Sequence, residues 1–231
     1  MTAVIIIFYN NTDFLLRQHE HLSLFMKDEY KLIVIDNSSD PVAAAGMKHH
    51  ADEKGLEYVR TQSSSKNGSA SHAFALCFAY QKYVNKFEYI LLLDHDAFLI
   101  KPLSAIETLA DKSIAGLGQI RNGEKYFWPG CCMFKTSIPM DFSISEGKDT
   151  GGNTSKAIQS VGEENCIFFD EVYVQNEGFN KSQYNFYALL SNGTFLHFIN
   201  GSNWANSTDN EERLNSLFNV LENYKNGTEN I

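Results

Sequence analysis

Short apolar runs and helical repeats alternate along the first hundred residues. Four runs without polar alternation are typical of strands buried on both faces: 4–8, 30–35, 56–59 and 90–93. Between them, apolar residues at helical spacing predict three helices: 14–26, 47–54 and 71–86. Strands and helices in this order imply right-handed βαβ units. We therefore expect an α/β protein with a Rossmann-like domain, in which helices flank a mostly parallel central sheet.

The second half of the chain is less regular. Five elements are expected there: a helix through 106–109, a strand over 113–118, a helix opening at 149–153, a strand-like run over 195–199 and a terminal amphipathic helix over 214–224. Residues 166–169 fit either a strand or a buried helical turn. The aromatic stretch 126–134 contains Pro129-Gly130, and no regular element is predicted for it.

Composition limits the class of protein. With 231 residues, 43% of them apolar, and no linker, residues 1–231 are expected to form a single domain. A formal charge of -9 without a Lys/Arg cluster argues against nucleic acid as a partner. The chain has no basic leader and no apolar run of about 18 residues, so we expect no membrane span and a soluble, cytoplasmic protein. Four cysteines without CxxC spacing predict reduced, buried thiols: Cys77, Cys131, Cys132 and Cys166.

Two carboxylates follow the 90–93 strand. Asp94 and Asp96 lie at its carboxyl end, where open α/β sheets bind ligands. In extended backbone residues i and i+2 point the same way, so these carboxylates converge while His95 points elsewhere. Two hard oxygen ligands suit Mg²⁺ or Mn²⁺, which complete their shells with water and phosphate oxygens. Asp-x-Asp also occurs as a turn and helix cap, so these residues alone fit both interpretations.

Four motifs in a fixed order resemble a known family. They are a first strand ending in Phe8-Tyr9-Asn10, a second ending in Asp36-Asn37-Ser38-Ser39-Asp40, a Lys66-Asn67-Gly68 loop before a helix, and Asp94-His95-Asp96. Together they resemble a glycosyltransferase of the A fold, a nucleotide-sugar-dependent family with an Asp-x-Asp motif. The resemblance implies a nucleotide-binding half over residues 1–100 and an acceptor-binding half over residues 101–231.

The resemblance implies a metal-dependent transfer of a sugar from a nucleoside-diphosphate sugar, with UDP expected before GDP, to a hydroxyl of a glycan or glycoprotein. The implied donor contacts are Phe8, Tyr9, Asn10, Asp36, Lys66, Asn67, Asp94, His95 and Gly201. Asp36 and Tyr9 would bind the nucleoside, Asp94 the ribose and metal, and Asp96 the metal and diphosphate. A turn cap before Pro41 is the alternative role of Asp36.

A late segment extends the resemblance. His197-Phe198-Ile199-Asn200-Gly201 resembles the His-Phe-x-x-Gly segment of metal-dependent members, which ends near a Trp, here Trp204. This implies that His197 joins Asp94 and Asp96 around Mn²⁺ or Mg²⁺, and that Gly201 admits the diphosphate. A satisfied core histidine is the alternative. The lysine expected near this segment is missing, and Lys66 or Lys181 are the candidates to neutralise the diphosphate.

Acceptor-side residues are harder to assign. Asp149-Thr150-Gly151-Gly152 resembles a segment of some of these transferases, and Asp149 is a candidate general base or acceptor ligand. An N-cap followed by a turn is its alternative. Asp170, followed by Glu171, is the reserve catalytic candidate. Trp128 is a candidate stacking platform for the acceptor sugar, although a single indole is more often a buried core residue.

Rival functions have specific difficulties. A haloacid-dehalogenase-type phosphatase would continue its Asp-x-Asp with Gly and Thr, whereas Ala97-Phe98-Leu99 follow here. A nucleotidyltransferase of similar fold would carry a Gly-rich basic loop after the first strand, where Tyr9-Asn10-Asn11-Thr12 stand. A non-catalytic sugar-nucleotide-binding scaffold is the alternative from a different class, because a fold does not guarantee a function.

Overall fold

The computed structural model describes residues 1–61, 68–144, 150–174, 187–199, 201 and 210–227. The strands of its large sheet are β1 (Thr2–Phe8), β2 (Tyr30–Asp36), β3 (Glu57–Arg60), β4 (Tyr89–Asp94), β6 (Ile114–Arg121), β7 (Glu124–Lys135) and β8 (Cys166–Phe169). A small sheet contains β5 (Ala97–Leu99), β9 (Glu171–Val174), β10 (Tyr187–Leu190) and β11 (Phe195–Phe198). The helices are α1 (Thr12–Phe25), α2 (Pro41–Lys54), α3 (Gly68–Tyr83), α4 (Ala105–Thr108), α5 (Ser155–Val161) and α6 (Asn210–Lys225), with 3-10 turns η1 (Gly152–Thr154) and η2 (Glu163–Asn165).

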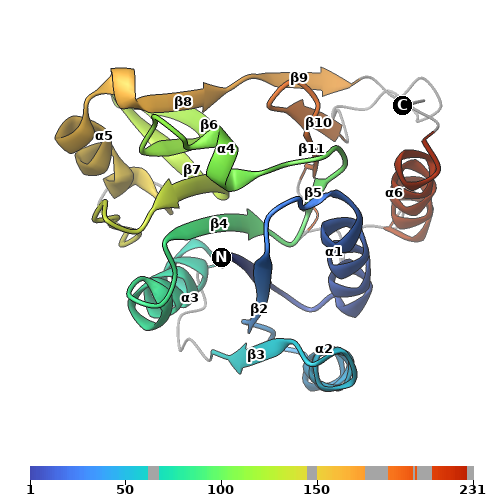
Figure 1. The fold of residues 1–231 in the computed structure, drawn as a ribbon. Coiled ribbons are helices and arrows are strands. Elements are labelled where there is room, and N and C mark those ends of the chain that lie inside the picture. Colours follow the sequence, from blue (N-terminus) through green and yellow to red (C-terminus); the bar gives the residue numbers. More distant parts are fainter. Residues whose placement is uncertain (62–67, 145–149, 175–186, 200, 202–209, 228–231) are drawn as a thin grey trace.

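The large sheet is mostly parallel, as predicted (Figure 1). Its order is β3-β2-β1-β4-β7-β6-β8. Only β7 runs against its neighbours β4 and β6, and the other pairings are parallel. The small sheet, β5-β11-β10-β9, is antiparallel throughout its described pairings. The two sheets meet where β4 continues into β5, through Asp94-His95-Asp96-Ala97.

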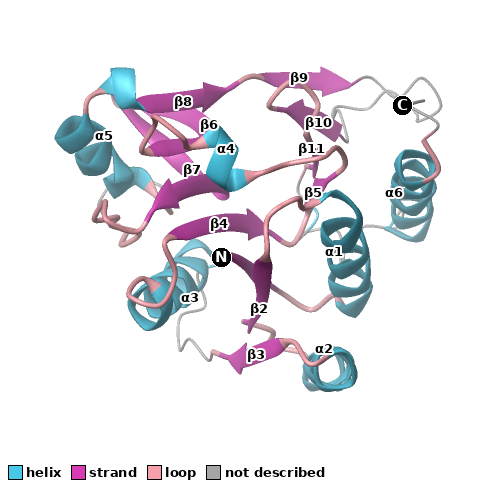
Figure 2. Ribbon diagram, viewed as in Figure 1, coloured by secondary structure: helices cyan, strands magenta, loops and turns pink. Residues whose placement is uncertain are grey.

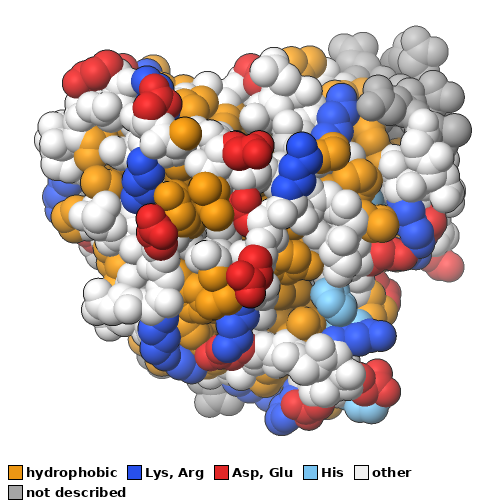
Figure 3. Space-filling model, in the orientation of Figure 1, with side chains coloured by type: hydrophobic (Ala, Val, Ile, Leu, Met, Phe, Trp, Pro, Cys, Tyr) orange, Lys and Arg blue, Asp and Glu red, His pale blue; other side chains and the backbone are white. Residues whose placement is uncertain are grey.

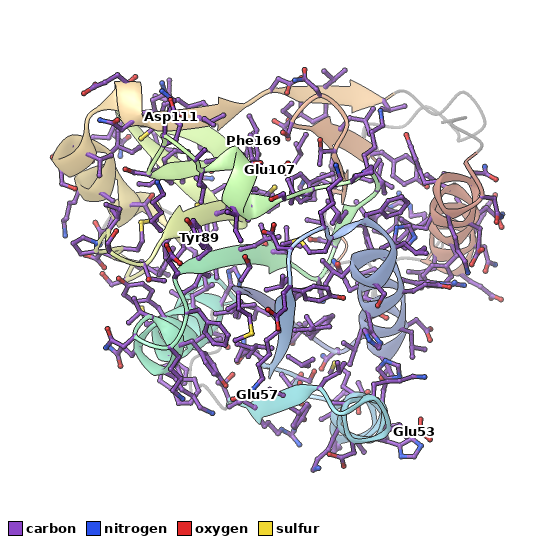
Figure 4. All side chains as sticks on the ribbon, viewed as in Figure 1. Glu53, Glu57, Tyr89, Glu107, Asp111 and Phe169 are labelled. Carbon is purple, nitrogen blue, oxygen red and sulfur yellow. The ribbon has the colours of Figure 1, made fainter. Side chains whose placement is uncertain are left out.

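Helices cover both faces of the large sheet (Figure 2). Side chains alternate across β1, so Val4 and Ile6 pack in the cluster that includes residues of α1, α2 and α6, whereas Ile5 and Ile7 pack with α3 and α5. All of these β1 residues are buried, which explains the continuous apolar run in the sequence. The small sheet adds to the first cluster. Phe169, labelled in Figure 4, lies 6.0 Å from Phe195 between ring centroids and joins the end of β8 to β11.

Local capping explains where two of the helices begin. The Asn11 side chain accepts a hydrogen bond from the Phe14 N–H at 3.1 Å and starts α1. The Asp40 side chain accepts from the Val42 N–H, and Pro41 follows it at the first helical position, so α2 begins six residues before the expected segment 47–54.

The stretch 126–134 corrects the sequence analysis, because it belongs to the long strand β7 rather than to an irregular segment. Pro129 and Gly130 fall at a register shift opposite residues 116–118 of β6, where the ladder accommodates proline. The 166–169 segment is a strand, β8. The helix expected to open at 149–153 begins later, at Ser155, after a 3-10 turn. β5, β9 and β10 were not predicted.

Surface and thiol features complete the description. On the face in Figure 3, basic side chains are scattered among acidic ones rather than gathered in a stripe. Among the described residues, no helix has both the length and the apolar character needed to cross a membrane. All four cysteines are free thiols, and Cys131 and Cys132 are fully buried, as expected, whereas Cys77 and Cys166 are only partly buried.

Candidate functional site

The Asp94-His95-Asp96 motif lies at the junction of the two sheets. Asp94 ends β4, and its neighbour in the large sheet is Ile7, near the carboxyl end of β1. β5 begins at Ala97 and pairs antiparallel with β11, which places His197 opposite Ala97. The fold therefore brings His197 beside the motif, although about a hundred residues separate them along the chain.

Helix α1 holds the backbone of this motif. The Gln18 side-chain amide donates to the carbonyl oxygens of Ala97 at 2.7 Å, His95 at 3.2 Å and Asp94 at 3.4 Å. Gln18 is fully buried. One buried amide, with two hydrogens, thus serves three carbonyl oxygens of the turn from β4 to β5. Sequence reasoning missed Gln18, and the available signal was a polar residue on the buried side of an amphipathic helix.

His95 faces the protein core. Its Nδ1 accepts a hydrogen bond from the Tyr9 backbone N–H at 3.2 Å, and its ring meets Phe14 edge to face at 5.1 Å. Burial lowers the pKa of His95 to about 4, so the ring is neutral and able to accept this bond. His95 therefore ties the end of β1 to the Asp-x-Asp turn, and the donor contact that the resemblance implied for it stays a prediction.

The two carboxylates of the motif have different surroundings. Asp94 retains 21% side-chain exposure, and its Oδ1 lies 3.0 Å from the Nε2 of His72, on α3. Burial would raise the pKa of Asp94, but the neighbouring histidines, His72 above all, together lower it below its ordinary value. Asp96 is buried, and burial together with the Asp94 charge raises its pKa to about 8.

His197 lies near Asp96 and also contacts Trp128. The Nε2 of His197 is 4.0 Å from Asp96 Oδ1, and its ring centroid is 4.7 Å from that of the half-buried Trp128. Burial lowers the pKa of His197 to about 4, which leaves a neutral imidazole. In the described part of the chain, His197 Nδ1 is buried without a hydrogen-bond partner. The structure thus brings the predicted metal and acceptor residues Asp96, His197 and Trp128 together.

Gly201 touches the same carboxylate. Its backbone N–H bonds to the Asp96 carboxylate, and a Cβ at this position would lie 2.6 Å from Asp96 Cβ and 2.9 Å from Oδ2. Such contacts are closer than side chains tolerate. Glycine is therefore required here for close backbone approach to Asp96.

The loops after β1 and β2 are fastened to each other. The Asn10 backbone N–H donates to Ser38 Oγ at 2.8 Å, and the Asp40 N–H donates to Asn10 Oδ1 at 2.9 Å. The exposed Tyr9 ring places its hydroxyl 3.2 Å from Ser39 Oγ. Asn10 has a φ of 51°, which asparagine tolerates better than most residues. Tyr9 is therefore the exposed aromatic ring among the predicted nucleoside contacts at these strand ends.

Asp36 and Phe8 are buried behind these loops. Both are 0% exposed. The Asp36 carboxylate accepts from the Ser38 N–H at 2.9 Å and from the Tyr58 hydroxyl, and Arg60 Nε lies 3.8 Å from its Oδ2. These protein contacts already use both carboxylate oxygens. The nucleoside-binding roles predicted for Asp36 and Phe8 remain predictions.

Only some of the remaining candidate residues lie in the part of the chain that the structure describes. Asp149, Lys66, Asn67, Lys181 and Trp204 lie outside the described residues. Asp170 is exposed and its Oδ1 accepts from the Asn192 N–H at 2.7 Å, in the turn between β10 and β11. Because this turn is at the end of β11 away from His197, the structure does not bring Asp170 beside the motif. Within the described ranges, no group of three or more His, Cys, Asp or Glu side chains is arranged to hold a metal ion.

Comparisons with known proteins rest on structure. The sequence matches no family model and no curated protein. Among solved structures, a mannosyltransferase, PcManGT from Pyrobaculum calidifontis, in complex with GDP-Man and Mn²⁺, shares 16% identity over 72% of this chain with a TM-score of 0.50. The bifunctional glycosyltransferase WbbM, without ligand, shares 10% identity over 72% of the chain (TM-score 0.45), and the galactosyltransferase LgtC, with donor and acceptor sugar analogues, 12% over 72% (TM-score 0.44).

The matches differ in how much of the other chain they cover. The aligned region spans 54% of PcManGT, 38% of WbbM and 72% of LgtC. At this identity the likeness concerns the fold. Together with the mostly parallel sheet and the Asp-x-Asp turn at the end of β4, the likeness to PcManGT shows that the chain has the glycosyltransferase A fold.

Proposed function

We propose that this protein is a metal-dependent glycosyltransferase that moves a sugar from a nucleoside-diphosphate sugar to an acceptor hydroxyl. The observation that carries the proposal is that His197 faces Asp96 across 4.0 Å at the junction of the two sheets, where Asp94 ends β4. This junction lies at the carboxyl end of β4, the position at which open α/β sheets bind ligands.

The residues at this junction fit a divalent cation. The 4.0 Å between His197 Nε2 and Asp96 Oδ1 is too long for a hydrogen bond. It is within reach of one ion bound by both atoms, because such bonds are about 2.1 Å long. Neutral imidazole with carboxylate oxygen is a donor set suited to Mn²⁺. Asp96 and His197 would hold the ion, with Asp94 alongside.

When bound, the cation would supply positive charge to the leaving diphosphate. The protein's own residues prepare the surroundings. Gly201 has no side chain to fill the space beside Asp96, and we infer that this lets phosphate oxygens approach there. Trp128 offers an aromatic face beside His197 on which a sugar ring can pack. Residues 1–100 would bind the nucleotide and residues 101–231 the acceptor, with Asp149 as the candidate base.

The sequence and the structural comparison each suggest nucleotides to test as donors. The sequence favours UDP first and GDP next, and the structural relative PcManGT was solved with GDP-Man and Mn²⁺. We therefore propose titrating UDP and GDP calorimetrically, each with and without Mn²⁺. The matching UDP-sugars and GDP-mannose are then tested for sugar transfer and for hydrolysis.

Asp96→Asn tests the site itself, with Asp52→Asn as the matched control, because Asp52 is an exposed carboxylate paired with Lys48 on α2. We expect Mn²⁺-dependent nucleotide binding and donor turnover in the wild type and in Asp52→Asn, and loss of both in Asp96→Asn. Binding without turnover of any donor would indicate a sugar-nucleotide-binding scaffold. Metal-independent binding that survives Asp96→Asn would refute the proposed site.

A further inference from the structure

His72 is a polar residue at the site that the sequence did not point to. It lies on α3, 22 residues before Asp94, and its Nε2 is 3.0 Å from Asp94 Oδ1. The side chains of His72 and Asp94 are 23% and 21% exposed, so the pair is neither sealed in the core nor freely solvated. A ring N–H at this distance donates a hydrogen bond to the carboxylate.

This contact distinguishes the two carboxylates of the motif. Asp94 Oδ1 is engaged by His72, whereas the nearest imidazole nitrogen to Asp96 Oδ1, that of His197, stands 4.0 Å away. The 4.0 Å between Asp96 and His197 matches the span of two metal–ligand bonds, whereas the 3.0 Å between Asp94 and His72 is a direct hydrogen bond with no space for an ion. The geometry therefore favours different tasks for the two aspartates.

The part of α3 that carries His72 is fixed from two directions. Asn37, after β2, donates its side-chain N–H to Ser71 Oγ at 2.9 Å, and Thr150 Oγ1 donates to the Ser69 carbonyl oxygen at 3.1 Å. These contacts come from the nucleotide half and the acceptor half of the chain. His72 is thus presented to Asp94 by a helix turn with little freedom to shift, as required of a group that orients another.

We propose that His72 is a positioning residue, which holds Asp94 Oδ1 so that Oδ2 is directed to a hydroxyl group of the nucleotide sugar, while Asp96 and His197 hold the cation. This inference rests on the proposed function. It assigns Asp94 to recognition of the nucleotide and removes it from the cation's required ligands. Removing the His72 hydrogen bond therefore weakens nucleotide binding more than it weakens cation binding.

Three variants test this role. His72→Leu and His72→Asn both remove a donor that reaches Asp94, while His72→Gln keeps an amide N–H near the place of Nε2. Phe74→Ala, at an exposed position on the same helix, is the matched control. Binding of Mn²⁺ alone, and of UDP and GDP in saturating Mn²⁺, is measured by calorimetry on the full chain, with a thermal melt to confirm folding.

We expect His72→Leu and His72→Asn to bind nucleotide about tenfold more weakly. In both, Mn²⁺ affinity stays within about twofold of the wild type, and His72→Gln recovers most of the loss. Unchanged nucleotide affinity in the folded Leu and Asn variants overturns the inference. An equal loss of Mn²⁺ affinity also overturns it, because His72 would then act on the cation. If the wild type binds neither nucleotide, the proposed function fails before any variant is compared.

Discussion

Replacing Gln18 with leucine removes the amide that holds the Asp-x-Asp turn. Gln18 donates to three carbonyl oxygens of this turn, yet one amide has only two hydrogens, so about two full hydrogen bonds are lost. A buried acceptor that loses its partner costs about 1–3 kcal/mol. The apolar leucine recovers part of this free-energy cost. The substitution also removes the Gln18 Oε1, a buried oxygen that has no hydrogen-bond partner among the described residues. The net destabilisation is about 3 kcal/mol.

This loss is measurable in two independent ways. For a domain of this size, about 3 kcal/mol lowers Tm by roughly 6–12 °C. Urea unfolding followed by circular dichroism gives the free energy of unfolding, and calorimetry gives the affinity for Mn²⁺. We expect the variant to be less stable and also to bind Mn²⁺ more weakly, because the turn that carries both aspartates is no longer held.

The matched control exchanges the same residue types in the opposite direction. Leu16 is 40% exposed on α1, and Leu16→Gln should change the free energy of unfolding by about 0.5 kcal/mol or less. If Gln18→Leu unfolds within about 1 kcal/mol of the wild type and keeps its Mn²⁺ affinity, the amide does not hold the turn and the reasoning is wrong.

Other parts of the site yield further predictions. Gly201→Ala places a methyl group against Asp96. We expect urea unfolding to show a destabilisation of about 1–3 kcal/mol, and calorimetry to show weaker Mn²⁺ binding. Unchanged stability and unchanged Mn²⁺ affinity would mean that the backbone at this position shifts freely. Burial lowers the pKa of His21, so the unfolded chain binds more protons below about pH 6.5 and stability is lost as the pH falls. His21→Asn keeps a donor for the Leu99 carbonyl oxygen but does not titrate in this range. Its free energy of unfolding should therefore fall less between pH 7.5 and 5.5 than that of the wild type. If both proteins lose the same free energy over this range, His21 does not cause the pH dependence. Trp128→Leu should raise KM for the acceptor while nucleotide affinity stays unchanged in calorimetry, and the reverse pattern would assign Trp128 to the donor.

Local sequence patterns were sufficient to predict the central strands of the large sheet. β1, β2 and β4 are buried on both faces, so each is a continuous apolar run in the sequence, whichever elements pack against it. The position of Asp94 and Asp96 at the end of β4 follows from that run alone. Helix ends required capping chemistry, and α2 shows how the Asp40-Pro41 pair extends a helix beyond its apolar repeat.

Long-range pairing decided the remainder. β7 contains Pro129-Gly130 and reads as a turn, but it is a strand because β4 and β6 hydrogen-bond to its two edges. The small sheet forms because β5 pairs with β11, which lies nearly a hundred residues later in the chain. Such short strands have little preference of their own and are stabilised by the partners that the fold supplies.

The same division applies to the candidate site. The sequence by itself determined the apolar strands and the carboxylates that end β4, and its resemblance to a family implied His197 as a metal ligand. Only the tertiary structure decided that His197 faces Asp96, that His72 holds Asp94, and that Gln18 supports the turn between them. The physical reason is that a local pattern records whether a side chain is buried. Which polar group it meets there depends on elements brought together from 22 to about a hundred residues apart.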